Sequence, residues 1–468
     1  MSTDSRRATR LRSGRRRFAV AFVAVVGALA VLVGGGSAVS LLQGPRLSDA
    51  QVDPAAAIDV AGSRVILTAN QALAEIDPSQ VTVEPAAAHT VEAAGRGIGI
   101  RFTAPLDAET EYRVRVADVR GIGGGPATTL ETSFVTPVAQ VLMLERSEQG
   151  DDTIYRESLD GERVAVLSHP EIDDFRATSD AIVVSVREDG HARLIVTDRD
   201  GSDPRDVTLP GDGIVTSLQV SERGGTIGYT YSDIPDANGD AGMQSVLHLS
   251  SLRDPSAEPT PIEVGGEAPS VDRWRFVPDS SALLMIDFDG ELILVEPDGA
   301  EPAFLGNALT IDAVTRGTYT AIVERIDAGV VSLDLATGEE QPIVEPDPSP
   351  GQLAFVAPLP DGDTVRRYTL LGDDGLPTGA AIAHVTADGE ARTLTEVSAP
   401  DVLQQVCVSP SGQYAAAVVA PNLVGNPYDS GAQPVPQTLE TRIVEVATGD
   451  EVATFDGFDI SWCAVGPW

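Results

Sequence analysis

The chain has 468 residues, enough for two or three domains, and its 70 acidic residues against 32 Arg, with no Lys, give a formal net charge of −38. That charge repels phosphate backbones and argues against nucleic-acid binding, while a hydrophobic content of 42% excludes wholesale disorder. Two cysteines are too few for a disulfide framework or a Cys-rich zinc site.

The N-terminus combines an arginine-rich tail with an apolar stretch. Residues 1–17 hold seven of the Arg residues, and residues 18–42 form an uncharged run of 25 residues. A membrane span needs about 20 apolar residues and a signal-peptide core only about 7–15, so the length predicts a retained transmembrane helix. The flanking Arg residues predict a cytoplasmic tail at 1–17 and an exported bulk, as in a single-pass cell-membrane protein. A signal peptide cleaved among the small residues 36–40 is the alternative, and it also exports the remaining chain.

Short alternating segments follow the apolar stretch. Residues 43–57 are interpreted as a linker, and residues 58–137 contain Val and Ile alternating with polar residues, the pattern of half-buried strands. No helical stripe of useful length occurs there. About 80 residues of short strands predict a small β-sandwich. The expected strands are 64–67, 81–83, 99–102, 112–116 and 133–135.

Three elements of this module resemble the bacterial Ig-like domain found in S-layer and other surface proteins. They are the turn Ile100-Arg-Phe-Thr-Ala-Pro-Leu-Asp107, the strand Tyr112-Arg-Val-Arg-Val116, and the closing Thr132-Ser-Phe-Val-Thr-Pro137. The resemblance covers this module only. It implies a spacer or adhesive domain and no catalytic residues.

From residue 138 onward the chain is punctuated by Asp-Gly pairs. Asp-Gly supplies the positive φ angles that two-residue hairpins need, and apolar strands lie between the pairs. Tight hairpins repeated through residues 138–468 without helices predict an array of antiparallel sheets. The pairs begin at 160, 189, 200, 212, 289, 298, 361, 374, 388 and 456.

The array has an internal repeat. Val271–Pro278 is similar to Leu403–Pro410, and Phe458–Val465 looks like a third copy. With these as unit starts, units begin near 139, 172, 214, 269, 309, 351 and 402, which predicts a β-propeller of seven blades, with six or eight as alternatives. The last copy has room for one strand and the first unit shows three. The chain end is therefore expected to complete the first blade and close the ring.

The segment Ile195–Leu209, with its Asp-Gly turn and Thr-Leu ending, resembles blades of TolB-like and WD-repeat-like propellers. Trp274–Pro278 and Cys407–Gly412 resemble the inner-strand motif of the same families. The resemblance covers residues 138–468 and implies architecture without a ligand. Together with the first module, the chain resembles a membrane-anchored envelope protein of the actinobacterial type. The expected fold class is all-β: one transmembrane helix, an Ig-like sandwich and a propeller.

Two candidate sites stand out. Asp236, Asn238 and Asp240 alternate in a turn, a spacing that can converge three oxygen ligands on Ca²⁺. Ala241 stands where an EF-hand loop has Gly, so a solvated hairpin insertion is the alternative. Cys407 and Cys463 follow equivalent repeat positions, and an oxidising compartment favours a disulfide between them that fastens the closing strand. Two buried thiols are the alternative.

No further constellation of catalytic residues is recognisable. The chain lacks a Gly-x-Ser-x-Gly elbow, and its five His residues are scattered and expected at the surface or in turns. We therefore expect a binding scaffold of the cell envelope without enzymatic activity or obligatory cofactor, whose partner is an envelope protein or polysaccharide. The alternatives are a lyase or hydrolase acting on carbohydrate through carboxylates in the propeller channel, and a purely structural envelope protein.

Overall fold

The structure is a computed structural model that describes residues 26, 44–147, 149–221, 224–235, 238–239, 242–278, 280–297, 299, 301–316 and 318–467. The expected cytoplasmic tail at 1–17 lies outside these residues, as does the expected transmembrane helix at 18–42 apart from Val26. Within the described part of the chain, no helix is both long and apolar enough to cross a membrane.

The chain divides into two compact units. The first contains the described residues up to Ala57, with 61–103 and 110–135. The second contains 58–60, 104–109 and the chain from Thr136 onward. The two short segments 58–60 and 104–109 thus belong to the second unit, whereas the sequence pattern places them in the first.

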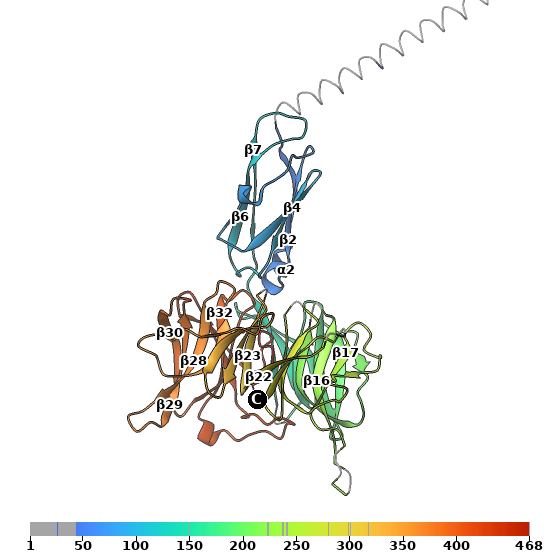
Figure 1. Ribbon diagram of the computed structural model, residues 1–468, viewed down its shortest axis with the longest axis vertical. Coiled ribbons are helices and arrows are strands. Elements are labelled where there is room, and N and C mark those ends of the chain that lie inside the picture. The colour runs from blue at the N-terminus through green and yellow to red at the C-terminus, as the bar shows by residue number, and fades with distance from the viewer. Residues whose placement is uncertain are drawn as a thin grey trace, which may run out of the picture. The chain divides into compact units, whose positions relative to one another are not determined.

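The first unit is a sandwich of two antiparallel sheets (Figure 1). Alternate residues such as Ile98, Ile100 and Phe102 are buried, so each sheet presents one apolar face to the core. The larger sheet has the order β1-β2-β5-β4, formed by Leu47–Gln51, Arg64–Ala69, Gly97–Phe102 and His89–Ala94. The smaller sheet has the order β3-β6-β7, formed by Val81–Glu84, Glu111–Val119 and Thr128–Val135.

Residues 43–57 are not a linker, which corrects the expectation from sequence. They contain strand β1, which pairs with β2, and most of helix α2, Pro54–Asp59. β1 is an edge strand whose residues Leu47–Gln51 are all at least partly exposed. Because nothing in it alternates between buried and exposed, the apolar periodicity that reveals other strands is missing.

The second unit consists of seven antiparallel sheets that follow one another along the chain, and it is a β-propeller. In six sheets, four consecutive strands pair in sequence order. The first strands of the sheets begin within two residues of the expected unit starts. The sheets are β8–β10 (Gln140–Glu145, Asp152–Ser158, Arg163–His169); β11–β14 (Ile172–Ala177, Ala181–Glu188, His191–Asp198, Arg205–Val207); β15–β18 (Gly213–Ser221, Thr226–Asp233, Val246–Ser251, Thr260–Pro261); β19–β22 (Val271–Phe276, Leu283–Asp287, Glu291–Val295, Ala303–Asn307); β23–β26 (Thr310–Thr315, Thr320–Arg325, Gly329–Asp334, Glu340–Pro342); β27–β30 (Gln352–Pro358, Thr364–Leu371, Pro377–Val385, Ala391–Ser398); and β31–β34 (Val402–Val408, Tyr414–Ala420, Glu440–Glu445, Glu451–Asp456).

The first of these sheets is completed by the end of the chain, as the repeat predicts. Phe458 and Leu144 exchange two backbone hydrogen bonds of 2.9 Å each, and the Ser461 amide donates to the Leu142 carbonyl at 2.9 Å. The segment 458–461 therefore lies beside β8 as a fourth strand. We call β8–β10 together with residues 458–461 the closing sheet.

The core of the propeller lies between neighbouring sheets. Leu284 and Ile286 of the fourth sheet pack with Ile311 and Val323 of the fifth. At the junction of the chain ends, one cluster joins Val418 of the seventh sheet, Leu142 and Leu144 of the closing sheet, and Ile182 and Val184 of the second. Because central strands are covered on both faces, they have nearly continuous apolar sequences; all seven residues of β32 are buried.

Candidate functional site

The first strands of successive sheets contact one another, and we call them the inner strands: β11, β15, β19, β23, β27 and β31, with residues 458–461 completing the set. Every one of these six named strands has a break in its register with the second strand. The skipped residues are Asp173, Ser217 with Leu218, Asp272, Asp312, Ala354 and Gln404. A β-bulge frees backbone groups from the ladder and redirects a side chain.

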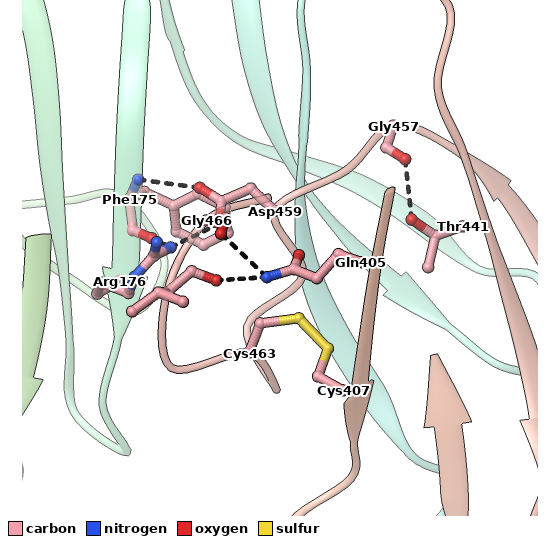
Figure 2. The surroundings of a disulfide bond; sticks show 10 residues. Phe175, Arg176, Gln405, Cys407, Thr441, Gly457, Asp459, Cys463 and Gly466 are labelled. Atoms are coloured by element: carbon pink, nitrogen blue, oxygen red, sulfur yellow. Dashed lines mark hydrogen bonds and ion pairs between the residues drawn. A yellow bond between two sulfur atoms is a disulfide. The ribbon is translucent and has the colours of Figure 1, made fainter. Parts of the chain in front are cut away.

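Backbone groups of the inner strands, at the bulges and beside them, form hydrogen bonds between sheets. In the closing sheet, the Asp459 carboxylate accepts a hydrogen bond of 3.4 Å from the Phe175 amide of β11 (Figure 2). Arg176 of β11 donates through Nε to the Leu218 carbonyl of β15 at 3.0 Å. Gln219 of β15 then donates through Nε2 to the Trp274 carbonyl of β19 at 2.7 Å. A polar side chain thus joins each of these sheets to the backbone of the next.

The same kind of contact recurs farther round the ring. The Val356 amide of β27 donates to the Asp312 carboxylate of β23 at 3.0 Å. Arg367, on β28 beside β27, donates through Nη1 to the Gln404 carbonyl of β31 at 3.2 Å.

The contacts return to the chain end at β31. Gln405 donates through Nε2 to the carbonyl oxygens of Val465 at 2.8 Å and Gly466 at 3.1 Å, and Figure 2 shows both bonds beside the disulfide. We call this set of contacts the axial polar ring. Each of its hydrogen bonds joins a side chain to backbone groups of a neighbouring sheet, so the ring stabilises the relative position of the sheets.

A buried charge cluster lies where the ring meets the chain end. Arg176 forms ion pairs with Asp459 at 2.6 Å and with Asp174 at 2.9 Å, and the three side chains are at most 5% exposed. Burial raises the pKa of Asp174 well above its usual value; the negative charge of Asp459 adds to this and Arg176 opposes it. Burial lowers the pKa of Arg176, but the two carboxyl groups outweigh it and raise that pKa overall. The raised pKa favours the neutral form of Asp174 beside the Arg176–Asp459 ion pair.

A second pair of charges lies on β19 and β23. Burial lowers the pKa of Arg275 to about 10, against the opposing influence of the Asp312 charge. Burial raises the pKa of Asp312 to about 6, although the Val356 amide and Arg275 both favour its charged form. A carboxyl group with a pKa near neutrality can exchange a proton at physiological pH, which is a property of general acids and bases.

Cys407 and Cys463 form a disulfide, with their Cα atoms 5.4 Å apart (Figure 2). Cys407 lies on β31, and Cys463 follows the fourth strand of the closing sheet, so the bond joins the seventh sheet to the first. This is the pairing expected from the sequence. Both residues are buried, in a cluster with Tyr414 and Ile460.

The expected calcium loop lies mostly outside the described residues. Asp236 and Asp240 are not described, and Asn238 lies in a turn. In the part of the chain that the structure does describe, no group of three or more His, Cys, Asp or Glu side chains is arranged to hold a metal ion. Calcium binding at Asp236, Asn238 and Asp240 therefore stays a prediction.

One histidine departs from the expectation of surface or turn positions. His248 of β17 is buried, with its ring stacked on Tyr229 and at right angles to Tyr231. Burial lowers its pKa, so the neutral ring is favoured in the folded protein. The sequence interpretation failed here because β17 alternates His and Ser with apolar residues while neighbouring sheets cover both of its faces.

Sequence reasoning also missed the charges on the inner strands. Asp459 and Arg275 stand inside the repeat copies that define the inner strands, Phe458–Val465 and Val271–Pro278. Charges that recur within a predicted inner strand are the signal that could have located them. Trp274 and Trp462 of the same copies are packing residues: Trp274 is buried beside Phe276, and Trp462 stacks on Tyr414.

No protein-family model matches the chain, and neither does any curated protein. Similar solved structures include one from a structural and mechanistic analysis of two prolyl endopeptidases, with 11% identity, 81% of this chain and 51% of that chain covered, and a TM-score of 0.49. The Cps50 (Swd1) β-propeller domain of Myceliophteria thermophila matches with 13% identity, 61% and 87% coverage and a TM-score of 0.40. A putative TolB from Agrobacterium tumefaciens matches with 13% identity, 68% and 90% coverage and a TM-score of 0.34. The chain spans about half the length of the endopeptidase it matches.

The first comparison corrects one expectation from the sequence, that the protein has no enzymatic activity. The matched structure is that of a prolyl endopeptidase, which is an enzyme. The similarity concerns the propeller and assigns no reaction to the present chain.

Proposed function

We propose that the protein is a membrane-anchored recognition platform of the cell envelope, in which an extracytoplasmic, seven-bladed propeller binds an envelope protein or polysaccharide. In this proposal residues 18–42 anchor the chain with its N-terminus in the cytoplasm, and the first unit is an Ig-like spacer. The observation that carries the proposal is the Cys407–Cys463 disulfide. Structural disulfides persist in oxidising compartments and are rare in the cytosol, so the bond supports export of the propeller.

The axial polar ring supports a platform role. Its side chains bind backbone groups of neighbouring sheets, and Arg176 is occupied by Asp174 and Asp459 within the protein. Inner strands fixed in this way give the hairpin turns a constant spacing. A rigid scaffold that carries variable turns is the usual arrangement of a binding protein.

Topology is tested with one engineered thiol. Val424, 98% exposed, is replaced by Cys in a Cys407→Ser, Cys463→Ser background, and intact cells are treated with a membrane-impermeant maleimide. Labelling of intact cells is the expected result. Labelling only after lysis would overturn the proposal. In the unmodified protein, alkaline carbonate should leave the chain with the membrane, whereas a chain lacking residues 18–42 should be released.

A second candidate function is an enzyme that uses inner-strand carboxyl groups, for which a lyase or hydrolase acting on carbohydrate is the class considered from the sequence. The observation in its favour is the pKa of Asp312, about 6, beside the positive charge of Arg275. The test is turnover of envelope polysaccharide by the purified full chain. Turnover that Asp312→Asn abolishes, and that Asp388→Asn leaves unchanged, would establish it; absence of turnover would reject it.

A further inference from the structure

Exposed apolar side chains are distributed unequally over the turns of the propeller. In an antiparallel sheet of four strands, the turn between the second and third strands lies at the opposite end from the other two turns. In the third to seventh sheets every second–third turn carries at least one large apolar side chain that is at least 36% exposed. These residues are Ile234, Met243, Phe288, Ile326, Leu376, Val424 and Tyr428.

The opposite ends of the sheets differ. Among the described residues of the first–second and third–fourth turns, Tyr319 is the one large apolar side chain exposed to this degree. Single exposed apolar residues are ordinary on a protein surface. An excess at one end of five successive sheets differs from such scattered exposure. We call the described residues of the second–third turns of the third to seventh sheets the apolar turn face.

Several of these residues share one neighbourhood. The Ala308 amide donates to the Gly290 carbonyl at 3.0 Å, and the Leu309 amide donates to the Glu324 carbonyl at 2.8 Å. Phe288 and Ile326 therefore lie in turns that are linked through residues 308–309. Phe288 is 67% exposed, Ile326 70% and Leu309, between them, 49%.

The charged residues of the apolar turn face are all acidic. None of its five turns contains Arg, Lys or His. Carboxylates stand beside the apolar residues: Asp289 follows Phe288, Asp327 follows Ile326, and Asp373 lies three residues before Leu376. All three carboxylates are exposed, and their side chains have no hydrogen-bond or ion-pair partner among the described residues.

We propose that the apolar turn face binds a basic, amphipathic segment of a partner protein, one that presents Arg or Lys beside apolar side chains. The inference rests on the proposed function for the existence of a partner and identifies its chemical class. Apolar anchors such as Phe288 and Ile326 enter the partner, and the neighbouring carboxylates pair with its cations. A second copy of this chain, with its net charge of −38, and an anionic lipid or polysaccharide are repelled by the same carboxylates.

The binding experiment uses the full chain in nanodiscs of zwitterionic lipid. Two fluorescent peptides are compared, one with Lys and Leu at helical spacing and one with Glu in place of every Lys. The Lys peptide should bind, and the Glu peptide should bind at least about tenfold more weakly, a difference that salt reduces. Equal binding of the two peptides would overturn the proposal.

Variants locate the binding on one face. Two triple variants should each weaken Lys-peptide binding at least about tenfold. One removes apolar side chains (Phe288→Ser, Ile326→Ser and Leu376→Ser), and the other removes carboxylates (Asp289→Asn, Asp327→Asn and Asp373→Asn). The matched controls change exposed residues of the opposite turns: Tyr319→Ser alone, and Glu258→Gln, Glu301→Gln, Asp388→Asn together. The controls should change binding less than about twofold. A loss of binding in the controls equal to that in the face variants would show general attraction to an acidic protein and reject the proposed face.

A photocrosslinking amino acid placed at 288, 376 or 319 in intact cells separates this inference from the proposed function. Crosslinks to a protein from 288 and 376, but not from 319, support both the platform function and the apolar turn face as its binding site. Crosslinks from 319 alone leave the platform function standing and overturn the face. Absence of crosslinks from all three positions counts against a protein partner and so against both.

Discussion

The closing sheet and the sixth sheet have the same four-stranded antiparallel form but are built from different stretches of chain. The sixth sheet, β27–β30, uses residues 352–398 joined by short turns, whereas the closing sheet pairs Leu144 with Phe458. Loop closure over about 300 residues costs about 3 kcal/mol more than closure over about 10. The closing sheet has additional covalent and ionic contacts: a disulfide, a buried ion pair and a side-chain acceptor at Ser461. The closing strand, which is distant in sequence from β8, is thus held by these contacts in addition to its backbone hydrogen bonds.

The largest effect is expected at Asp459. Replacement by Ala leaves Arg176 with one carboxyl partner and places Ala at a φ of 53°, so the free energy of unfolding of the propeller should fall by about 3–5 kcal/mol. Asp459→Asn keeps the hydrogen-bonding groups and tolerates this backbone conformation, so it should lose less than half as much. Chemical denaturation measures both, with Asp456→Ala on exposed β34 as the control. Equal losses of unfolding free energy for Asp456→Ala and Asp459→Ala would show that the buried charge cluster has no special role in stability.

The disulfide gives the next effect. The double variant Cys407→Ser, Cys463→Ser should lower the free energy of unfolding by about 2–4 kcal/mol, since the bond closes a loop with a sequence separation of 56. Hydrogen exchange should accelerate at Leu142 and Leu144 of the closing sheet and stay unchanged in the sixth sheet. Reducing agent should reproduce the effect in the unmodified protein and do nothing to the variant. Faster exchange throughout the propeller would show that the bond acts on the whole ring instead.

A variant of Asp312 tests how the sixth sheet is held to the fifth, because the Asp312 carboxylate accepts a hydrogen bond from the Val356 amide of β27. Its pKa is raised from an unfolded value of 3.8 to about 6 in the folded protein. The stability that this shift contributes is fully present below pH 3.8 and is lost as the pH rises through about 6. Between pH 5 and pH 7.5, Asp312→Asn should therefore gain about 1–1.5 kcal/mol relative to the unmodified protein. The control is Asp289→Asn on the surface, and a parallel pH dependence of the two variants would contradict the assignment.

The smallest effect is expected at Ser461, whose Oγ accepts from the Leu142 amide at 3.0 Å. Ser461→Ala removes one of the contacts that hold the chain end to β8 and should cost about 0.5–1.5 kcal/mol. Ser398→Ala, at the exposed end of β30, is the matched change in the sixth sheet and should be neutral. Thermal unfolding compares the two. If Ser461→Ala leaves the unfolding temperature unchanged, then Asp459 and the disulfide alone stabilise the position of the closing strand.

The sequence predicted the parts of the fold that repeat locally. Strands such as Ala181–Glu188 are apolar runs ended by Asp-Gly turns, and the repeat copies at Val271, Leu403 and Phe458 led to the ring and its closing strand. Strand β1 and the burial of His248 could not be predicted in this way. An exposed edge strand has no apolar period, and burial of a polar residue depends on sheets that are distant in the sequence.

The candidate site was predictable to a smaller extent. The Cys407–Cys463 pair was expected from the oxidising compartment that the N-terminus predicts, but the cluster of Asp174, Arg176 and Asp459 joins two strands that are far apart in the chain. In a sequence with 70 acidic residues, no composition rule separates these three from the rest. Their role comes from the bulged backbone of the inner strands, which a pattern of residue types does not reveal.

The completion of the closing sheet by residues 458–461 has a consequence for biosynthesis. Strand β8 emerges from the ribosome about 300 residues before its partner, a delay on the order of 15 to 60 seconds at ordinary elongation rates of about 5–20 residues per second. During that interval its edge is available to chaperones and to the other strands of nascent chains. A nascent chain interrupted before Phe458 has no means of covering that edge, so a protease that recognises unpaired strands would distinguish unfinished copies from finished ones.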